Sequence, residues 1–395
     1  MSIFNKVAII GTGTTKFGEN FDMDYKDLLI DACYQAFNDA RVEPRDIQAG
    51  WLGTYMPYAW GFEGNAGNTV TETLNLAPVP ITRVANYCVT GMEAIRNAAL
   101  AVASGEYDVV LAVGVEKMRD VPSRGSLVAQ HVEKGHPVYC KGRTAPGMFA
   151  LLATRYLYEN RLDRKTLSRV AVKNHRNGAM NPKAHFQKEI NIEQALNAPM
   201  VAEPLGLYDC APTTDGAAAC ILTRAEIARK FTDDFAVIKG IGLSTWGGYF
   251  TMQFNPEFNF LEFKSSQEAA RIAYSQAGIK NPSEEIDVFE CHDCFTITEI
   301  INYEDLMLAE RGRGWMLIEE GKTALEGDIP VNPSGGLKSF GHPIGASGVR
   351  MVNEIADQLR GRCGKRQVRN ARTGLAHTLG GPGVVSCVTV LERGD

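Results

Sequence analysis

Apolar and polar positions follow two different periods along the chain, and the two periods alternate. Residues 7–11 and 109–115 form short apolar runs rich in β-branched side chains, which predict buried strands. Residues 24–40 and 90–104 carry apolar or small side chains at helical spacing, which predicts helices with one buried face. Strands that alternate with helices in this way are typical of an α/β protein whose central strands are buried and largely parallel.

One sequence pattern occurs twice. Residues 36–47 and 273–287 both read as the end of an amphipathic helix, a turn that contains proline, an acidic step and then a strand. The two copies begin 273 − 36 = 237 residues apart, which is far longer than the period of a solenoid repeat. The pattern therefore predicts that a whole domain is duplicated. We expect the first half to comprise residues 1–116 and 206–232, and the second half to comprise residues 233–395.

The stretch between the two parts of the first half has a different character. Residues 117–205 hold many Arg and Lys residues, few strand patterns and four of the seven histidines of the chain. These histidines are His131, His136, His175 and His185. We expect this stretch to form a helical lobe that is inserted in the first half and folds over it.

Composition narrows the class of protein. Apolar residues make up 45% of the chain and charged residues 22%, which is ordinary for a globular protein and excludes intrinsic disorder. The 39 glycines and 17 prolines follow no period, which excludes a fibrous chain. The chain has 41 basic and 46 acidic residues and no basic block, so we expect no nucleic-acid partner.

Targeting signals and cysteine usage bear on the compartment. No run approaches the roughly 18 apolar residues of a membrane span, and the first residues read as a strand rather than a signal peptide. The nine cysteines are an odd number and lie mostly in apolar segments, as thiols of a reducing compartment do. We therefore expect a cytoplasmic protein without a membrane partner.

Cys88 is the first candidate for chemistry. It lies in the segment Asn-Tyr-Cys-Val-Thr-Gly at residues 86–91, directly before the predicted helix 90–104. The free N–H groups and the positive end of a helix dipole favour the thiolate form of such a cysteine. Gly91 would allow a substrate to approach closely. A buried structural cysteine is the alternative, and this segment alone leaves both readings open.

A second candidate segment is Glu-Cys-His-Asp-Cys-Phe at residues 290–295, where a predicted strand leads into a helix. Cys291 and Cys294 have the spacing of half a zinc site, but zinc needs four ligands and the chain has no second pair. A redox pair is another alternative, although the thioredoxin-like context is missing. We therefore expect no metal on this chain, and His292 and Cys294 stay candidates for catalysis.

Two glycine-rich segments follow. Residues 332–348 deliver a single histidine, His342, directly before Pro343 and a predicted helix, and they lack the residue order of a phosphate-binding loop. Residues 375–383 predict a turn whose N–H groups face an anion or an oxyanion. Within this turn His377 is either reactive or a cap of the turn.

Two other motifs are incomplete or missing. The pair of glycines at residues 11 and 13 lacks the third glycine of a dinucleotide fingerprint, so we expect no dinucleotide site. No G-x-S-x-G elbow is present, which counts against an α/β-hydrolase.

Taken together, these four segments resemble the signature blocks of the thiolase superfamily. Residues 215–219, which close the first half, are also similar to that family. The block His-Asp-Cys-Phe at residues 292–295 resembles the sterol-carrier-protein-type and archaeal-type thiolases. The resemblance implies a five-layered α-β-α-β-α fold, built from two duplicated halves with a loop domain inserted in the first. Residues 117–205 match that loop domain.

The resemblance also implies roles for individual residues. Cys88 would take the acyl group from coenzyme A as a thioester, and His342 would accept its proton and help to hold the thioester oxygen. His292 would complete the first oxyanion hole. The second would consist of the N–H groups of Cys88 and of the turn that contains Gly380 and Gly381. Cys294 would supply the second acid/base. Many thiolases carry a cysteine where this chain has His377, which we predict to lie at the substrate.

The function implied is thiolysis of a β-ketoacyl-CoA, or the reverse Claisen condensation, with coenzyme A as co-substrate. Two alternatives stay open. One is a β-ketoacyl synthase, in which His377 would be the third member of a Cys-His-His set. The other is a thiolase-like subunit that acts as a scaffold or retro-aldolase. The family also implies a homodimer, and its members of this type are often accompanied by a small zinc-ribbon/OB-fold subunit, which would give a heterotetramer.

Overall fold

The computed structural model describes residues 5–60, 66–121, 144–247 and 258–394. His131 and His136 lie outside these residues. Most described strands form one nine-stranded sheet in the order β3-β2-β4-β7-β1-β8-β11-β10-β9, and β5 and β6 pair separately. In chain order the nine strands are β1 Val7–Thr14, β2 Ala49–Gly53, β3 Ile81–Val84, β4 Val109–Glu116, β7 Gly216–Arg224, β8 Ala236–Thr245, β9 Val288–Glu290, β10 Thr373–Gly380 and β11 Val385–Arg393.

Helices lie on both faces of this sheet, and further described helices pack against one another beside it. The described helices are α1 Tyr25–Ala40, α2 Gly67–Thr73, α3 Thr90–Ala103, α5 Ala145–Asn160, α6 Arg164–Ala179, α7 Ile192–Leu196, α9 Lys264–Ala277, α10 Pro282–Glu285, α11 Thr296–Asp305, α12 Gly314–Glu319, α13 Gly336–Phe340 and α14 Ile344–Leu359. The strands and helices predicted from residues 7–11, 24–40, 90–104 and 109–115 are all present.

The expectation of largely parallel strands is wrong. Five of the eight described pairings in the large sheet are antiparallel, and three are parallel. The parallel pairs lie at the two outer ends of the sheet. Of the antiparallel pairs, β10 and β11 are joined by a short hairpin. The other antiparallel pairs join strands from distant parts of the chain. The alternation of strand and helix does not report such pairings.

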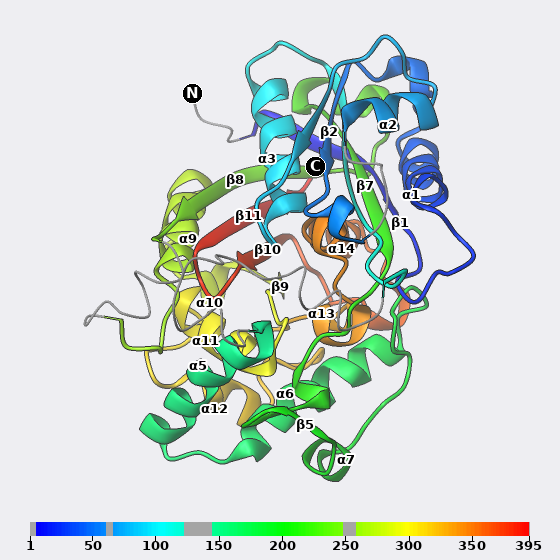
Figure 1. Cartoon of the computed structure of the whole chain (residues 1–395). Coiled ribbons are helices and arrows are strands. Elements are labelled where there is room, and N and C mark those ends of the chain that lie inside the picture. The colour runs from blue at the N-terminus through cyan, green and yellow to red at the C-terminus, as the bar shows by residue number, and fades with distance from the viewer. Residues whose placement is uncertain (1–4, 61–65, 122–143, 248–257, 395) are drawn as a thin grey trace.

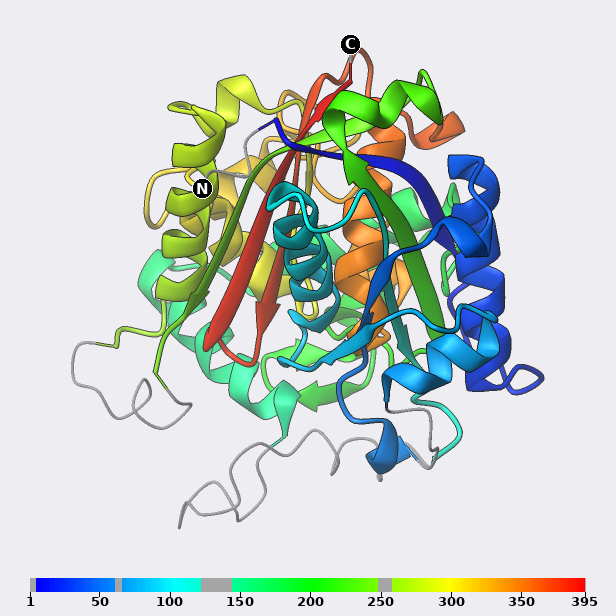
Figure 2. The ribbon, with the colours of Figure 1, turned by 90° about the horizontal axis from the view of Figure 1, so that it is seen from above.

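Five layers are visible when the molecule is seen from above (Figure 2). Helix α1 covers the strands of the first half on one side, and α9 covers β8 and β11 on the other. Helices α3 and α14 lie between the two groups of strands and contact both each other and the sheet. The predicted α-β-α-β-α architecture is therefore confirmed. Among the described strands, only β1 and β8 pair across the two groups, at Ala8–Val237 and Ile9–Ala236.

The two halves repeat the same strand-to-helix packing. In β1, a Cβ at Gly11 or Gly13 would lie 2.4 or 2.0 Å from a carbonyl oxygen of α1. In β8, a Cβ at Gly240 or Gly242 would lie 2.3 or 1.9 Å from a carbonyl oxygen of α9. The two glycines of each strand therefore let a helix pack closely on it. This explains the glycine pair near the N-terminus without a dinucleotide.

The inserted stretch packs against the second half, so the expectation that it folds over the first half is wrong (Figure 1). Helix α6 contacts α11, α12 and α13, and α5 contacts α11. The hydroxyl of Tyr156 in α5 donates to Glu304 at 2.5 Å. The amide of Asn174 in α6 donates to Asp293 at 2.8 Å. The lobe also contains a small antiparallel ribbon of β5 Met200–Ala202 and β6 Leu205–Gly206.

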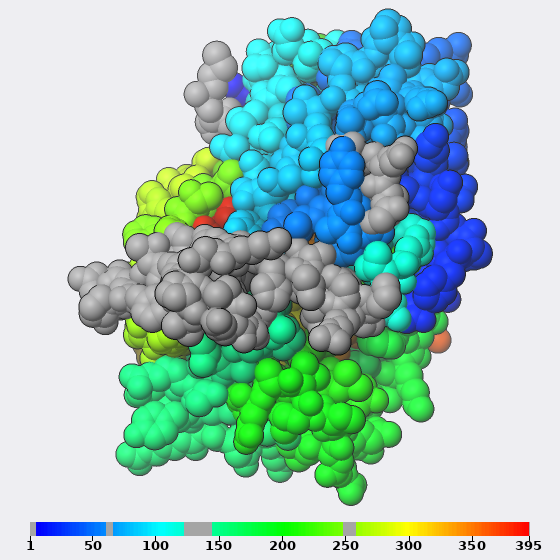
Figure 3. Space-filling view, in the orientation of Figure 1, coloured from blue at the N-terminus to red at the C-terminus, as the bar shows by residue number. Residues whose placement is uncertain are grey.

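The surface view shows the first half above the inserted lobe on one face of the molecule (Figure 3). The exact boundaries between the two halves and the lobe stay predictions. Among the helices of the described part of the chain, none combines the length and the apolar character that crossing a membrane requires.

Candidate active site

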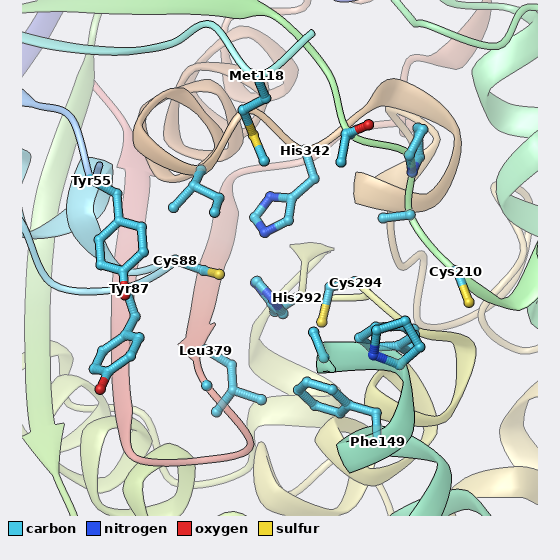
Figure 4. A pocket seen from close by; sticks show the side chains of 18 residues that line it. Tyr55, Tyr87, Cys88, Met118, Phe149, Cys210, His292, Cys294, His342 and Leu379 are labelled. Carbon is cyan, nitrogen blue, oxygen red and sulfur yellow. The ribbon is translucent and has the colours of Figure 1, made fainter. Parts of the chain in front are cut away.

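One pocket gathers the residues that the sequence singled out. Its cavity measures about 830 Å³, including open solvent at its mouth. The side chains of Cys88, His292, Cys294 and His342 point toward a common space (Figure 4). Much of the remaining wall is apolar or aromatic and is formed by Tyr55, Tyr87, Met118, Pro146, Phe149, Phe295, Ile344 and Leu379. Such a wall with a few convergent reactive groups is typical of a small-molecule site.

Cys88 lies in the connection between β3 and α3. The residue before it, Tyr87, has a φ of 46°, in the left-handed region that non-glycine residues rarely adopt. The Thr90 hydroxyl holds this turn, because it donates to the Tyr87 carbonyl at 2.6 Å and accepts from the Asn86 N–H at 2.8 Å. The turn leaves the thiol partly exposed at the pocket, in front of the first turn of α3.

His342 occupies the position in the second half that Cys88 occupies in the first. Each lies two residues before its helix, α3 or α14, and these helices pack against each other. The contact is close because a Cβ at Gly91 would lie only 2.4 Å from the Gly345 carbonyl oxygen. Glycine at these positions therefore brings the two helix starts together. The Cys88 sulfur and a ring nitrogen of each of His292 and His342 all lie within 4.8 Å of one another.

The hydrogen bonds of His342 determine which of its nitrogens is free. The Ser347 hydroxyl donates to the Pro343 carbonyl at 2.8 Å, so its oxygen is left to accept from the Nδ1–H of His342 at 2.7 Å. Nδ1 therefore carries the proton. Nε2 is buried and has no hydrogen-bond partner among the described residues. A lone pair at this nitrogen is available to accept the proton of a nucleophile.

His292 presents two nitrogens without a partner among the described residues, although the residue is only 1% exposed. Its ring lies nearly perpendicular to that of His342, with the ring centres 5.3 Å apart. Asn302 holds the main chain from the other side, because its amide donates to the His292 carbonyl at 2.8 Å. A buried polar group without a partner is costly, so a substrate oxygen would satisfy it.

His377 lies outside the pocket wall, behind His292. It belongs to strand β10, which continues through Gly380, so the turn predicted over 375–383 is confined to its last residues. The Nε2 of His377 lies 3.0 Å from the Ser266 hydroxyl, and the Nδ1 accepts from the His292 N–H at 3.5 Å. The geometry thus joins His377 to the main chain of His292 rather than to the cavity.

The N–H groups of Cys88 and Gly381 are directed at the Cys88 thiol. Leu379 and Gly381 line the pocket, whereas Gly380 lies beside the turn that holds Cys88. A Cβ at Gly380 would lie 2.7 Å from the Cβ of Tyr87, so a side chain there would displace this turn. Two convergent N–H groups are what a developing oxyanion next to the sulfur requires.

Burial sets the charge state of the reactive groups. It raises the pKa of the Cys88 thiol to about 12, with a further contribution from the negative charge of Glu116. Burial also lowers the pKa of His342 to about 3, and it lowers that of His292 well below its ordinary value. Burial therefore outweighs the helix N-terminus, and the expectation that Cys88 favours the thiolate is wrong. Thiol and imidazole are both neutral.

Cys294 lies beside this group and lines the pocket at 8% exposure. Its carbonyl accepts from the Ala211 N–H at 2.8 Å, which fixes the connection between β9 and α11 that carries it. Burial, followed by the nearby Cys88, raises the pKa of its thiol well above the ordinary value. Cys294 is therefore a protonated thiol that can donate a proton in the pocket.

The sequence did not single out several residues that build the site. Tyr55, Phe149 and Cys210 line the pocket, and Ser347 orients His342. Most of them lack a reactive motif of their own, and the fold brings them together from four separate segments. Glu116 gave a detectable signal, because it is a single carboxylate at the end of an otherwise apolar strand.

Comparison with known proteins gives a consistent family. Residues 7–226 match the model described as "Thiolase, N-terminal domain", and residues 251–393 match "Thiolase C-terminal domain-like". The chain is 39% identical over 387 residues to an acetyl-CoA acetyltransferase of Methanothermobacter thermautotrophicus, and the match covers 98% of this chain and 99% of that protein. It is 32% identical over 411 residues to human sterol carrier protein 2, covering 98% of this chain and 72% of that protein.

Two solved structures share the fold. A structure described as an Ltp2-ChsH2(DUF35) aldolase superposes with a TM-score of 0.84 at 25% identity, and the match covers 99% of both chains. Human mitochondrial 3-ketoacyl-CoA thiolase superposes with a TM-score of 0.73 at 16% identity over the full length of both chains. At this low identity the second match reports on the fold alone.

Proposed function

Because this chain belongs to the thiolase family, we propose that its pocket transfers an acyl group between coenzyme A and a β-ketoacyl-CoA through a thioester on Cys88. The resemblance predicted from the sequence blocks is confirmed by the family models and the relatives. The chain is an acyltransferase of this family. The observation that carries the proposal is the spacing of Cys88, His292 and His342, whose reactive atoms lie within 4.8 Å of one another.

The first step forms the acyl-enzyme. His342 Nε2 accepts the proton of the Cys88 thiol as the sulfur attacks the ketone carbon of the β-ketoacyl-CoA. The oxyanion that forms is held by the N–H groups of Cys88 and Gly381. The bond between this carbon and the α-carbon then breaks. Its electron pair moves into the departing acetyl-CoA enolate, whose oxygen accepts a hydrogen bond from His292.

The departing enolate needs a proton at carbon. Cys294 lies in the same pocket as a neutral thiol, so we assign it this proton transfer. In the second step the thiol of coenzyme A attacks the Cys88 thioester, and its proton goes to the Cys294 thiolate. Cys88 leaves as a thiolate and recovers its proton from His342. Each group has then returned to its initial state, and the reverse sequence is the Claisen condensation.

The spacing of Cys88, His292 and His342 would also admit a metal ion. The proposed steps use the two imidazoles as a proton acceptor and a hydrogen-bond donor, and they assign no metal to the chain. His377 acts indirectly in this scheme, by holding the main chain of His292.

Replacing Cys88 tests the proposal directly. Cys88→Ala should lower thiolysis of acetoacetyl-CoA by at least about 1,000-fold, because the covalent route is removed. Cys33→Ala is the matched control, since Cys33 is buried in α1 on the outer layer, away from the pocket. The assay follows acetyl-CoA formation, and mass spectrometry follows the acyl adduct on Cys88. Turnover by the Cys88→Ala variant at the rate of the control would refute the proposal.

The two alternative activities are less well supported. A β-ketoacyl synthase would need His377 in the pocket as a third member, and the described structure places it behind His292. The structural match to an aldolase is the observation in favour of a retro-aldolase. Retro-aldol cleavage of a β-hydroxyacyl-CoA consumes no coenzyme A, whereas thiolysis requires it. Cleavage of the β-hydroxy substrate in the absence of coenzyme A would favour that alternative.

We further propose a cytoplasmic homodimer that degrades fatty or aromatic acyl-CoAs. The eight cysteines of the described residues are free thiols, which supports a reducing compartment. Strand β3 is an edge of the sheet and can pair with a second chain. The match to an aldolase with a DUF35 partner supports an additional small subunit, for which we propose the zinc-ribbon/OB-fold type. Affinity purification at low salt with mass measurement tests the dimer and the small subunit. A monomer without a co-purifying chain would contradict both proposals.

A further inference from the structure

Glu116 is a buried carboxylate that the proposed reaction does not use. It is the last residue of β4 and is fully buried. No Lys, Arg or His nitrogen of the described residues forms an ion pair with it. An isolated buried carboxylate is costly, so the hydrogen bonds that it accepts must offset this cost.

The carboxylate holds two separate segments of the pocket wall. One oxygen accepts from the Thr54 hydroxyl at 2.9 Å, and the other accepts from the N–H groups of Tyr55 at 2.9 Å and Gly345 at 2.8 Å. Gly345 is the second residue of α14, whose preceding residue, Pro343, has no side chain that could cap the helix. Glu116 of the first half therefore caps the helix that follows His342 in the second half.

The segment that carries Tyr55 is held from its other side as well. The guanidinium of Arg83 in β3 donates to the carbonyls of Thr54 and Tyr55 at 3.1 and 3.0 Å. Tyr55 in turn packs against Tyr87, the residue before Cys88, with tilted rings whose centres lie 5.6 Å apart. The Glu116 carboxylate is therefore connected to the helix that follows His342 and, through Tyr55 and Tyr87, to the turn that holds Cys88.

The equivalent position of the second half supports a specific role. Glu116 and Gly380 end equivalent strands, and each lies beside the start of the opposite half's central helix: Gly345 of α14 for Glu116, and Cys88 before α3 for Gly380. At Gly380 there is no side chain, which leaves room for the Cys88 turn. At residue 116 a carboxylate fills the corresponding space and bonds to the helix start.

We propose that Glu116 is a positioning residue for acyl transfer, which ties the start of α14, and with it His342, to the Tyr55 wall of the Cys88 pocket. This proposal rests on the proposed function, since it assigns His342 as the proton acceptor of Cys88. The groups that face the carboxylate are Tyr25 from α1, Tyr55 after β2, and Cys88 before α3.

Two variants separate the hydrogen bonds of Glu116 from its charge. Glu116→Asp keeps the charge but is one carbon shorter, so it cannot reach Thr54, Tyr55 and Gly345 at once. Glu116→Gln removes the charge and keeps the reach. Its oxygen can accept from Tyr55 and Gly345, and its NH₂ can donate to the Thr54 hydroxyl, which can rotate to accept.

The experiment measures two rates on each variant at about pH 8, where Cys88 of the wild type is a neutral thiol. Mass spectrometry follows single-turnover acylation of Cys88 by acetyl-CoA and, separately, its alkylation by iodoacetamide, with Cys210 as an internal measure of general exposure. We expect Glu116→Asp to acylate about 10- to 100-fold more slowly, with alkylation unchanged. We expect Glu116→Gln to acylate within about threefold of the wild type and to alkylate faster, because a nearby negative charge is gone.

Acylation of Glu116→Asp at the wild-type rate would overturn the proposal. An equal loss in both variants would do the same, since it would indicate general damage. If Glu116→Asp does not fold, Thr54→Val removes a single donor: we expect acylation about threefold slower, and an unchanged rate overturns the proposal. Cys88→Ala separates this result from the proposed function, because continued turnover by that variant contradicts the acyl-enzyme whatever Glu116 does.

Discussion

The charge state of Cys88 and His342 makes a prediction at the scale of the residue. The pKa of His342 is lowered to about 3, so its imidazole is neutral and can accept a proton at all higher pH values. The Cys88 thiol stays protonated until about pH 12. Burial raises the pKa of Glu116 to about 7, so the test uses Glu116→Gln, in which residue 116 does not titrate. We expect single-turnover acylation by this variant to be level across neutral pH and to fall only as the pH drops toward about 3. A step centred near about 6.5, the ordinary histidine value, would contradict this assignment.

The reactive residues themselves could be predicted from the sequence, but their protonation could not. Cys88, His292, Cys294 and His342 each stand in a short motif at the end of a predicted strand or the start of a helix, and the fold brings all four into one pocket. Their charge depends on how deeply each atom is buried, which a motif does not contain. The location of His377 was likewise hidden, because the length of β10 depends on its pairing with β11.

At the scale of the element, the contact between α3 and α14 sets the distance between nucleophile and base. Gly91→Ala would place a Cβ 2.4 Å from the Gly345 carbonyl, a backbone atom that cannot move alone. We expect the helices to separate, with a loss of about 1–3 kcal/mol in unfolding free energy and about 100-fold in acylation. Denaturant unfolding and the single-turnover assay measure the two effects. Gly18→Ala, where the nearest atom lies at 3.8 Å, should change neither.

Element types followed from local patterns, whereas their pairing did not. The apolar runs and helical spacing predicted β1, α1, α3 and β4 to within a few residues. The antiparallel centre of the sheet depends on β7, which returns to pair with β1 and β4 only after the inserted lobe. The docking of that lobe on α11–α13 depends on buried polar pairs between distant residues, such as Asn174 and Asp293. No periodicity along the chain reports such contacts.

For the whole molecule, a partly buried ion pair connects the two halves. Arg360, whose side chain is fully buried at the end of α14, donates to both carboxylate oxygens of Asp39 in α1, at 2.7 and 2.8 Å. Asp39→Ala would leave this guanidinium without its main partner. Because Asp39 is partly exposed and Arg360 keeps Asp234 and Asp357 nearby, we expect the unfolding free energy to fall by about 1–3 kcal/mol. Thermal unfolding measures the loss, and Glu268→Ala, which breaks an exposed pair with Arg271, should leave the melting temperature unchanged. Equal melting temperatures for all three proteins would show that the Asp39 tie adds nothing.

The equivalence of Cys88 and His342 has a consequence for how the enzyme can be divided. The position two residues before the central helix holds the Cys88 sulfur in one copy of the repeat and the His342 imidazole in the other. Neither copy contains both groups. A fragment that ends after the first copy would therefore fold around a nucleophile without its base. Its counterpart would hold the base without the Cys88 thiol. Activity would return only when the two fragments reassemble, because the pocket takes residues from both copies.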